Sequence, residues 1–366
     1  MNIDFVDLKR QNRIYKKEIT KAIEDTVFNA TFSLGKPLEE FEKKFAAFCD
    51  KKYAVGLNSG TDALFLTLIA YGIGKGDEVI TAANSYIASA MTVSNVAATP
   101  VLADVDPKSY NIDPKEIEKR ITRKTKAIIP IHLYGQSADM DPIVDIAKKH
   151  RLIIIEDCCQ AHGGKYKDKI LPYTETGAFS FYPGKNLGAF GDGGAVVTDN
   201  KQIKEKLKYL RNDGSVEKYV HETFGYKSRL DTLHASILLA KLKHLEKWNQ
   251  KRRKAAQKYN KLLKGIEQIK TPVEMPYAYH AYHIYAILAE KRDALKKYLE
   301  KNGISTVIHY PTPIHLQPVY KNLGYKKGDF PIAEKLAKKT LSLPMFPEIK
   351  DSEIEYICKK IKTFYK

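Results

Sequence analysis

The chain has 366 residues, 43% of them hydrophobic, and a formal net charge of +18. This composition supports a sizeable buried core and excludes a chain that is disordered throughout. No apolar run approaches the roughly 20 residues that span a bilayer, and the first residues lack the apolar segment of a signal peptide, so we expect no membrane association.

The positive charge is spread over helical segments such as 201–211 and 251–264, where lysines are mixed with apolar residues. Because no arm or recognised module concentrates this charge, we expect no nucleic-acid partner, whereas a small anionic substrate would benefit from the positive field. The four cysteines match no zinc-site spacing, so no metal is expected, and reduced thiols favour a cytoplasmic location.

The first two thirds of the chain alternate between strands and helices. A first helix is expected after Pro37, with large apolar residues at helical spacing up to Phe48. Further on, strands are predicted at 54–58, 77–82, 99–106, 127–135, 152–159, 176–182 and 193–199, and helices at 59–72, 85–97 and 138–150. Because the strands are continuous apolar runs between helices, the pattern predicts an α/β fold with a mostly parallel sheet that is flanked by helices.

The pattern changes after about residue 230. A long helix is predicted at 233–264, a strand at 279–290, a helix at 291–303 and a strand at 305–316 that runs into a proline-rich loop. We therefore expect a large α/β domain at 1–240 and a smaller C-terminal α+β domain at 241–366, on which the N-terminal segment packs.

Two groups of polar residues fall at the ends of predicted strands, where ligands bind in open α/β sheets. Gly60 and Thr61 open a helix, whose free N–H groups favour a phosphate, although an ordinary helix cap has the same pattern. Asp157 ends a strand and must be paired or solvated there, and an arginine partner is the plain structural alternative. Glu156 should point to the other face of the sheet.

Lys185 lies in the glycine- and proline-containing turn FSFYPGKNLG, with no charged residue within six positions. An apolar, glycine-lined site lowers the pKa of a lysine and makes its amine nucleophilic, whereas most loop lysines are simply solvated. Together with Asp157 and the turn at Gly60, Lys185 supplies what pyridoxal 5′-phosphate (PLP) needs. The phosphate needs donors, the pyridine nitrogen needs a carboxylate, and the aldehyde needs an amine.

Five segments carry a resemblance to a known family: NSGTDAL, IIEDCCQAHGG, FSFYPGKNLGAFGDGGAVVTD, SRLDTLHAS and HYPTPIHLQPVY. In order and spacing they resemble the DegT/DnrJ/EryC1/StrS family of PLP-dependent sugar aminotransferases over nearly the whole chain. The resemblance implies fold type I, which is like aspartate aminotransferase, and a homodimer in which each site is built from both subunits.

The resemblance also implies roles for the matching residues. Lys185 would bond covalently to the cofactor and, once freed, carry protons during catalysis. Asp157 would pair with the pyridine nitrogen, Gln160 would approach the phenolic oxygen, and Tyr86 would stack on the ring. The residues implied to hold the phosphate are Gly60, Thr61, Ser180 and Lys227, the last reaching the partner subunit's site. The candidate substrate contacts are Tyr182, His221, His309, Tyr310 and His315, each of which could instead pack in the core or at an interface.

Two positions depart from the family pattern. Lys227 stands in GYKSR, where relatives usually carry Asn in GYN-x-R, and Asp213 stands in LRNDG, where many relatives carry His or Tyr. An ammonium can still contact a phosphate. We therefore expect the phosphate contacts to differ in detail from those of relatives, and the substrate contacts to change at Asp213.

Two motifs bear on the substrate. KYVHETFGYKSRLD and HYPTPIHLQ resemble the subgroup that aminates C3 of a nucleotide-linked 3-keto-6-deoxyhexose. Members that aminate C4 of a 4-keto-6-deoxyhexose more often carry GYNYR and HYIPVHLQ. We expect L-glutamate to supply the amino group and a sugar linked to dTDP to accept it at C3, in amino-deoxysugar biosynthesis, with amination at C4 as the alternative.

Three other classes of protein fit the sequence less well. Sugar dehydratases of this family carry His in place of the lysine, and Lys185 counts against them. A PLP-binding sensor or nucleic-acid-binding relative would be expected to carry an appended helix-turn-helix, and no such pattern is visible. A Rossmann dehydrogenase needs G-x-G-x-x-G after its first strand, which SGTDAL does not supply.

Overall fold

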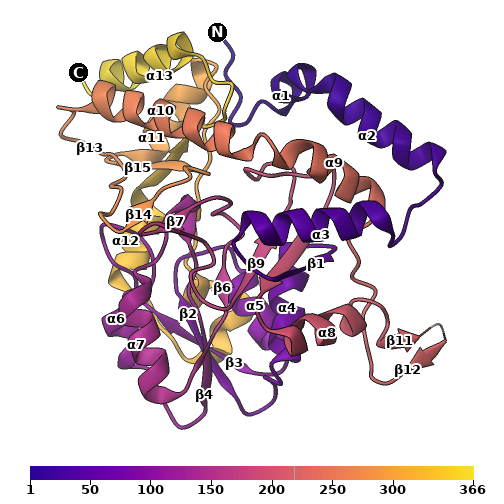
Figure 1. The fold of residues 1–366 in the computed structure, drawn as a ribbon. Helices are drawn as coiled ribbons and strands as arrows, with labels where there is room; N and C mark the ends of the chain where they lie inside the picture. Colours follow the sequence, from indigo (N-terminus) through magenta and orange to yellow (C-terminus); the bar gives the residue numbers. More distant parts are fainter. Residues whose placement is uncertain (218) are drawn as a thin grey trace.

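The computed structural model describes residues 1–217 and 219–366. A central sheet organises the larger part of the molecule (Figure 1). One half has the order β3-β2-β4-β5 and is parallel throughout, and the other has the order β1-β10-β9-β6. The strands are β1 (Tyr53–Leu57), β2 (Glu78–Ala82), β3 (Thr99–Ala103), β4 (Thr125–Ile129), β5 (Ile153–Ile154), β6 (Glu156–Asp157), β9 (Thr176–Ser180) and β10 (Gly194–Thr198).

The two halves form one continuous sheet. The N–H of Ile155 donates to the carbonyl of Ile128 at 3.0 Å, and the N–H of Asp157 donates to the carbonyl of Pro130 at 2.9 Å. β10 is antiparallel to both of its neighbours, while β6 and β9 are parallel. The expected mostly parallel sheet is therefore confirmed, with β10 as its reversed strand.

Helices cover both faces of this sheet. On one face, α3 (Lys36–Phe48) and α7 (Met140–His150) pack against apolar side chains such as Ile128 and Phe179. On the other face, α4 (Gly60–Ala70), α5 (Ala88–Asn95) and α8 (Lys201–Leu210) pack against Ala127 and Val196. Burial on both faces explains why the strands read as unbroken apolar runs.

The C-terminal part contains a second, smaller sheet with the order β13-β15-β16 (Figure 1). Ile3 forms a bridge with Ile304 and belongs to the same apolar cluster as the C-terminal helices. The elements of this part are α9 (Thr232–Leu242), α10 (Leu245–Leu263), β13 (Ile269–Lys270), β14 (Ala278–Tyr279), β15 (Tyr285–Ala289), α11 (Arg292–Lys301), η2 (Ile314–Leu316), η3 (Pro318–Leu323), α12 (Pro331–Lys339), β16 (Thr340–Leu343) and α13 (Asp351–Phe364).

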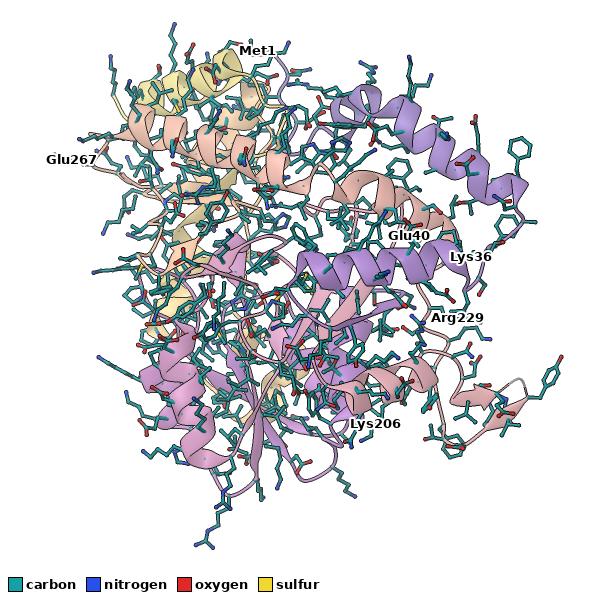
Figure 2. The ribbon with its side chains drawn as sticks, viewed as in Figure 1. Met1, Lys36, Glu40, Lys206, Arg229 and Glu267 are labelled. Atoms are coloured by element: carbon teal, nitrogen blue, oxygen red, sulfur yellow. The ribbon has the colours of Figure 1, made fainter. Side chains whose placement is uncertain are left out.

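Short elements complete the chain. The hairpin of β11 (Ser215–Glu217) and β12 (Val220–His221) projects from the body beyond α8, on the same side as Arg229 and Lys36 (Figures 1 and 2). The remaining elements are α1 (Leu8–Ile14), α2 (Lys16–Phe28), α6 (Pro114–Glu118), η1 (Leu133–Gly135), β7 (Lys165–Tyr166) and β8 (Lys169–Ile170). No described helix combines the length and apolar character that crossing a membrane requires.

Three element predictions need correction. The long helix at 233–264 is two helices, because the chain breaks between α9 and α10 at Lys243 and His244. The strand predicted at 305–316 is reduced to one bridge between Val307 and Ser342, because its proline-rich half continues into a loop and η2. The strand predicted at 127–135 ends at Ile129, where a proline follows, and the chain then turns into η1.

Candidate active site

Most of the predicted site residues line one cavity of about 640 Å³ at the carboxyl ends of β1, β6 and β9. Because these three strands run in the same direction, the segments that follow them emerge at one edge of the sheet. The predicted residues in the cavity wall are Gly60, Thr61, Tyr86, Asp157, Gln160, Ser180, Tyr182, Lys185, His309 and Tyr310.

The start of α4 forms one end of the cavity. The hydroxyl of Ser59 caps the helix by accepting from the N–H of Asp62 at 3.0 Å, and Gly60 and Thr61, whose N–H groups have no partner within the helix, line the cavity. A Cβ at Gly60 would lie 2.6 Å from the Cβ of Ser180, so only glycine permits this approach. The close packing gathers backbone donors and two hydroxyls at a helix N-terminus, a donor set that suits a phosphate.

Asp157 faces the cavity from the end of β6 and is buried. One carboxylate oxygen accepts from the hydroxyl of Ser89 at 2.8 Å, and the other accepts from the N–H of Cys159 at 3.1 Å. The partners are therefore a hydroxyl and a backbone amide, and no arginine pairs with this carboxylate in the described structure. Glu156 points to the other face, as expected, where it accepts from the ring of His132 at 2.8 Å.

Lys185 lies in the turn after β9, with its N–H bonded to the carbonyl of Tyr182 at 2.9 Å. Burial lowers the pKa of the Lys185 ammonium, and the nearby Cys159 and Asp157 oppose this shift. The ammonium makes no hydrogen bond or ion pair with any residue that the structure describes. A half-buried amine with a lowered pKa and no partner among the described residues is suited to attack a carbonyl carbon.

Aromatic and amide groups form a further part of the cavity wall. The oxygen of the Gln160 amide accepts from the N–H of Tyr134 at 2.8 Å. The NH₂ group of Gln160 therefore points the other way, and it donates to the hydroxyl of Tyr310 at 3.1 Å. The ring of Tyr86 lies 6.0 Å from that of Tyr310, at 45°. His309 completes this wall, and burial together with the charge of Lys185 lowers its pKa to about 4, so it is neutral near pH 7.

Three predicted residues lie outside this cavity. His315 is buried and its Nε2–H donates to the Glu334 carboxylate at 3.1 Å, so the chain does not bring it to the candidate substrate site. Lys227 forms an ion pair with Asp213 at 2.9 Å, and His221 is exposed with its Nδ1 at 2.9 Å from the Asp213 carbonyl. The motif that contains His221 and Lys227 begins at Lys218, which lies outside the described residues.

Sequence reasoning missed several groups in the wall. Ser89 and Cys159 hold the Asp157 carboxylate, and Cys159 follows Asp157 by two positions in the motif IIEDCCQAHGG. His283 also lines the cavity, although it precedes β15 and lies about a hundred residues from Lys185 in the sequence. The HIYAI segment around it gave only a strand signal, so no local pattern pointed to a site there.

The residues present fit PLP. The donors at Gly60, Thr61 and Ser180 suit its phosphate, the held carboxylate of Asp157 suits its pyridine nitrogen, and the unpartnered amine of Lys185 suits its aldehyde. A mostly parallel sheet with this set at its carboxyl edge defines a PLP-dependent enzyme of fold type I.

Comparisons with known proteins identify the family. A model of the DegT/DnrJ/EryC1/StrS aminotransferase family matches residues 13–362. The chain is 45% identical to a pleiotropic regulatory protein of Geobacillus stearothermophilus, over 100% of this chain and 99% of that protein. It is 44% identical to the dTDP-3-amino-3,4,6-trideoxy-alpha-D-glucose transaminase of Streptomyces venezuelae, over 95% of this chain and 92% of that enzyme.

Solved structures agree. The crystal structure of DesV from S. venezuelae has a TM-score of 0.98 and 42% identity, covering 100% of this chain and 99% of that one. A Bacillus subtilis structure with the bound cofactor PMP has a TM-score of 0.93 and 30% identity, covering 100% of this chain and 85% of that one. The chain therefore belongs to the DegT/DnrJ/EryC1/StrS aminotransferase family. It is a PLP-dependent aminotransferase that acts on sugars.

Proposed function

We propose that the protein transfers the amino group of L-glutamate to C3 of a 3-keto-6-deoxyhexose linked to dTDP. The observation that carries the chemistry is the shared cavity of Lys185 and Asp157, with the phosphate-binding start of α4 beside them. The similarity to the S. venezuelae transaminase, whose name specifies a 3-amino sugar on dTDP, supports amination at C3.

Bound PLP would supply an electron sink, and the chain supplies the rest. Lys185 provides the amine that holds the cofactor and then moves the proton at the substrate carbon. Asp157, held by Ser89 and Cys159, would pair with the pyridine nitrogen and support its positive charge. The NH₂ group of Gln160, which donates to Tyr310, would use its second hydrogen toward the ring oxygen, and the exposed ring of Tyr86 would stack on the ring.

The exposed tyrosine and the histidine of the cavity wall are proposed to contact the hexose. Tyr182 is 59% exposed at the cavity rim, and His309 presents a neutral imidazole from the other side. Neutral rings and hydroxyls suit a sugar, which carries hydroxyls and no charge. The diphosphate would then extend outward, where the net charge of +18 favours an anion.

We also propose a homodimer in the cytoplasm, in which Lys227 and His221 serve the site of the other subunit. This proposal rests on the β11–β12 hairpin, which projects from the body and contributes none of its described residues to the cavity wall, and on the family pattern. We further propose that each subunit consists of a large domain at 1–240 and a small domain at 241–366.

A regulatory role is the second candidate, because the Geobacillus stearothermophilus relative is named a pleiotropic regulatory protein. The intact set of Lys185, Asp157 and the helix start favours catalysis, since a binding protein needs no unpartnered amine.

The test is NMR of the product formed with glutamate, with dTDP-linked 3-keto and 4-keto 6-deoxyhexoses offered in separate reactions. Amination of the 3-keto sugar alone is expected. Amination of the 4-keto sugar alone would contradict the proposed regiochemistry while leaving the role of Lys185 intact. No product from either sugar, despite a visible band of bound PLP, would contradict the proposed substrate class.

A further inference from the structure

His283 lines the cavity that contains Lys185 and has no role in the chemistry described above. It lies two residues before β15 of the smaller sheet, so it reaches the cavity from the C-terminal part of the chain. Its hydrogen-bond partners identify which ring nitrogen carries the proton.

A buried chain of amides fixes the position of the ring proton. The NH₂ group of Asn249 donates to the carbonyl of His162 at 2.8 Å, so the Asn249 oxygen is left as an acceptor. The NH₂ group of Asn186 donates to that oxygen at 2.8 Å and to the carbonyl of Ala281 at 3.1 Å. Because both N–H bonds of Asn186 are used, its oxygen accepts from Nδ1 of His283, 3.2 Å away.

The proton of a neutral His283 therefore sits on Nδ1, and Nε2 carries a lone pair. Nε2 bonds to no residue in the described part of the chain and is not sealed from solvent, so it opens on the cavity. Burial, with the charges of Lys185 and Arg252 and the neighbouring His309 and His162, holds the pKa of His283 well below its usual value. The ring is consequently an acceptor near pH 7.

Lys185 is a donor of this cavity that bonds to none of the described residues, and it precedes Asn186 in the chain. We propose that His283 is a positioning residue for Lys185: as PLP enters the cavity and before the covalent bond forms, the amine, which has no partner among the described residues, turns to donate a hydrogen bond to Nε2 of His283. The bond aims the amine at the cofactor's aldehyde carbon. This inference deepens the proposed function and rests on the role given there to Lys185.

The test is the rate at which added PLP becomes covalently attached to the cofactor-free full chain, followed by stopped-flow absorption. H283N keeps a donor beside Asn186 but loses the acceptor in the cavity, and H283Q keeps an acceptor in the cavity but loses the donor beside Asn186. We expect attachment to slow about tenfold in H283N, as for loss of one hydrogen bond to a charged group, and to stay within about threefold of wild type in H283Q.

His280 supplies a matched control. It is buried, burial lowers its pKa to about 3, its Nδ1 accepts from the N–H of Tyr282 at 2.9 Å, and it lies outside the cavity. H280N should therefore attach PLP within about twofold of wild type. In turnover, H283N should lower kcat more than it raises KM for glutamate, since the bond aims a reacting group.

The opposite order, with H283N faster than H283Q, would overturn the proposal, because it would assign the effect to the bond with Asn186. Equal attachment rates in wild type and both variants would overturn it as well. If neither variant folds, ¹⁵N NMR of ring-labelled wild type still tests it, since a proton on Nε2 of His283 excludes the proposed acceptor. A wild type that attaches PLP but aminates no sugar would count against the proposed function alone.

Discussion

Asp213 and Lys227 form an ion pair at 2.9 Å, with a backbone bridge between Asn212 and Lys227 beside it. These are the two positions at which the sequence departs from the family pattern, and the structure joins them. The ammonium of Lys227 holds the pKa of the Asp213 carboxyl below its usual value. The positive charge of Lys227 thus balances the negative charge of Asp213, so we expect the effects of these two residues to be coupled.

The pair predicts coupled effects on cofactor retention. K227A and D213N should each weaken PLP binding a few-fold, because Lys227 is proposed to reach a phosphate from a position that Asp213 fixes. The double variant should bind no more weakly than K227A. Equilibrium binding of PLP measures this, with K227N as the control that restores the usual family residue. Unchanged affinity in K227A would place Lys227 away from the phosphate.

Replacing Lys185 tests the central assignment. K185A should lose the absorption band of covalently attached PLP. Its turnover should fall about a hundredfold to ten-thousandfold, because both the covalent bond and the proton transfer depend on the Lys185 amine. Circular dichroism and the melting temperature should match those of K201A, an exposed lysine on α8. Turnover near the wild-type value in K185A would end the proposed mechanism.

The carboxylate network predicts graded losses. D157N should retain PLP but lose at least about a hundredfold in turnover, because a neutral amide no longer keeps the pyridine nitrogen protonated. S89A removes one hydrogen bond to that carboxylate and should cost about tenfold. Steady-state kinetics and the pH dependence of the bound-PLP spectrum measure both. Full activity in D157N would remove the electron-sink role.

The tight packing at Gly60 predicts a cofactor-binding defect. A methyl group there would meet the Cβ of Ser180 at 2.6 Å and the sulfur of Cys159 at 2.9 Å. Overpacking of this kind costs about 1–3 kcal/mol, which should appear as about tenfold weaker PLP binding or more in G60A. G74A is the control, because the nearest atom to its Cβ would lie 3.5 Å away. Equal affinity in the two variants would contradict the phosphate role of this turn.

Lys241 predicts a pH dependence of stability. It is buried on α9 and donates to the carbonyl of Gly188 in the turn of Lys185, and burial lowers its pKa from 10.5 to about 8. Between pH 8 and 10.5 the unfolded chain keeps a proton that the folded chain has released. The contribution of Lys241 to the free energy of unfolding therefore becomes more favourable as the pH rises through this range.

Melting temperatures of wild type and K241M test this sign. The amount by which the melting temperature of K241M exceeds that of wild type should shrink as the pH rises from 7.5 to 10. At the higher pH, folded wild type no longer buries the charge of Lys241. K201M, at an exposed position, should show no such change relative to wild type. A difference that grows with pH would show that the folded protein favours the charged form of Lys241.

The sequence by itself determined the fold class and the chemical core of the site. Unbroken apolar strands between helices encode a sheet buried on both faces, and short motifs place Gly60, Asp157 and Lys185 at the ends of strands. These features are local, since a strand end and the turn after it are specified by neighbouring residues. The same local signals mispredicted 305–316 as a strand, because prolines there deny the backbone its ladder partners.

Only the tertiary structure decided which distant groups join that core. His283 meets Asn186 across 97 positions of sequence, and Asp213 meets Lys227 through the fold of the β11–β12 region. His315, which the motif HYPTPIHLQ predicts as a substrate contact, forms a hydrogen bond with Glu334 instead. Contacts of this range depend on how the smaller sheet and its helices pack against the large one, and no pattern within a few residues of either partner encodes that packing.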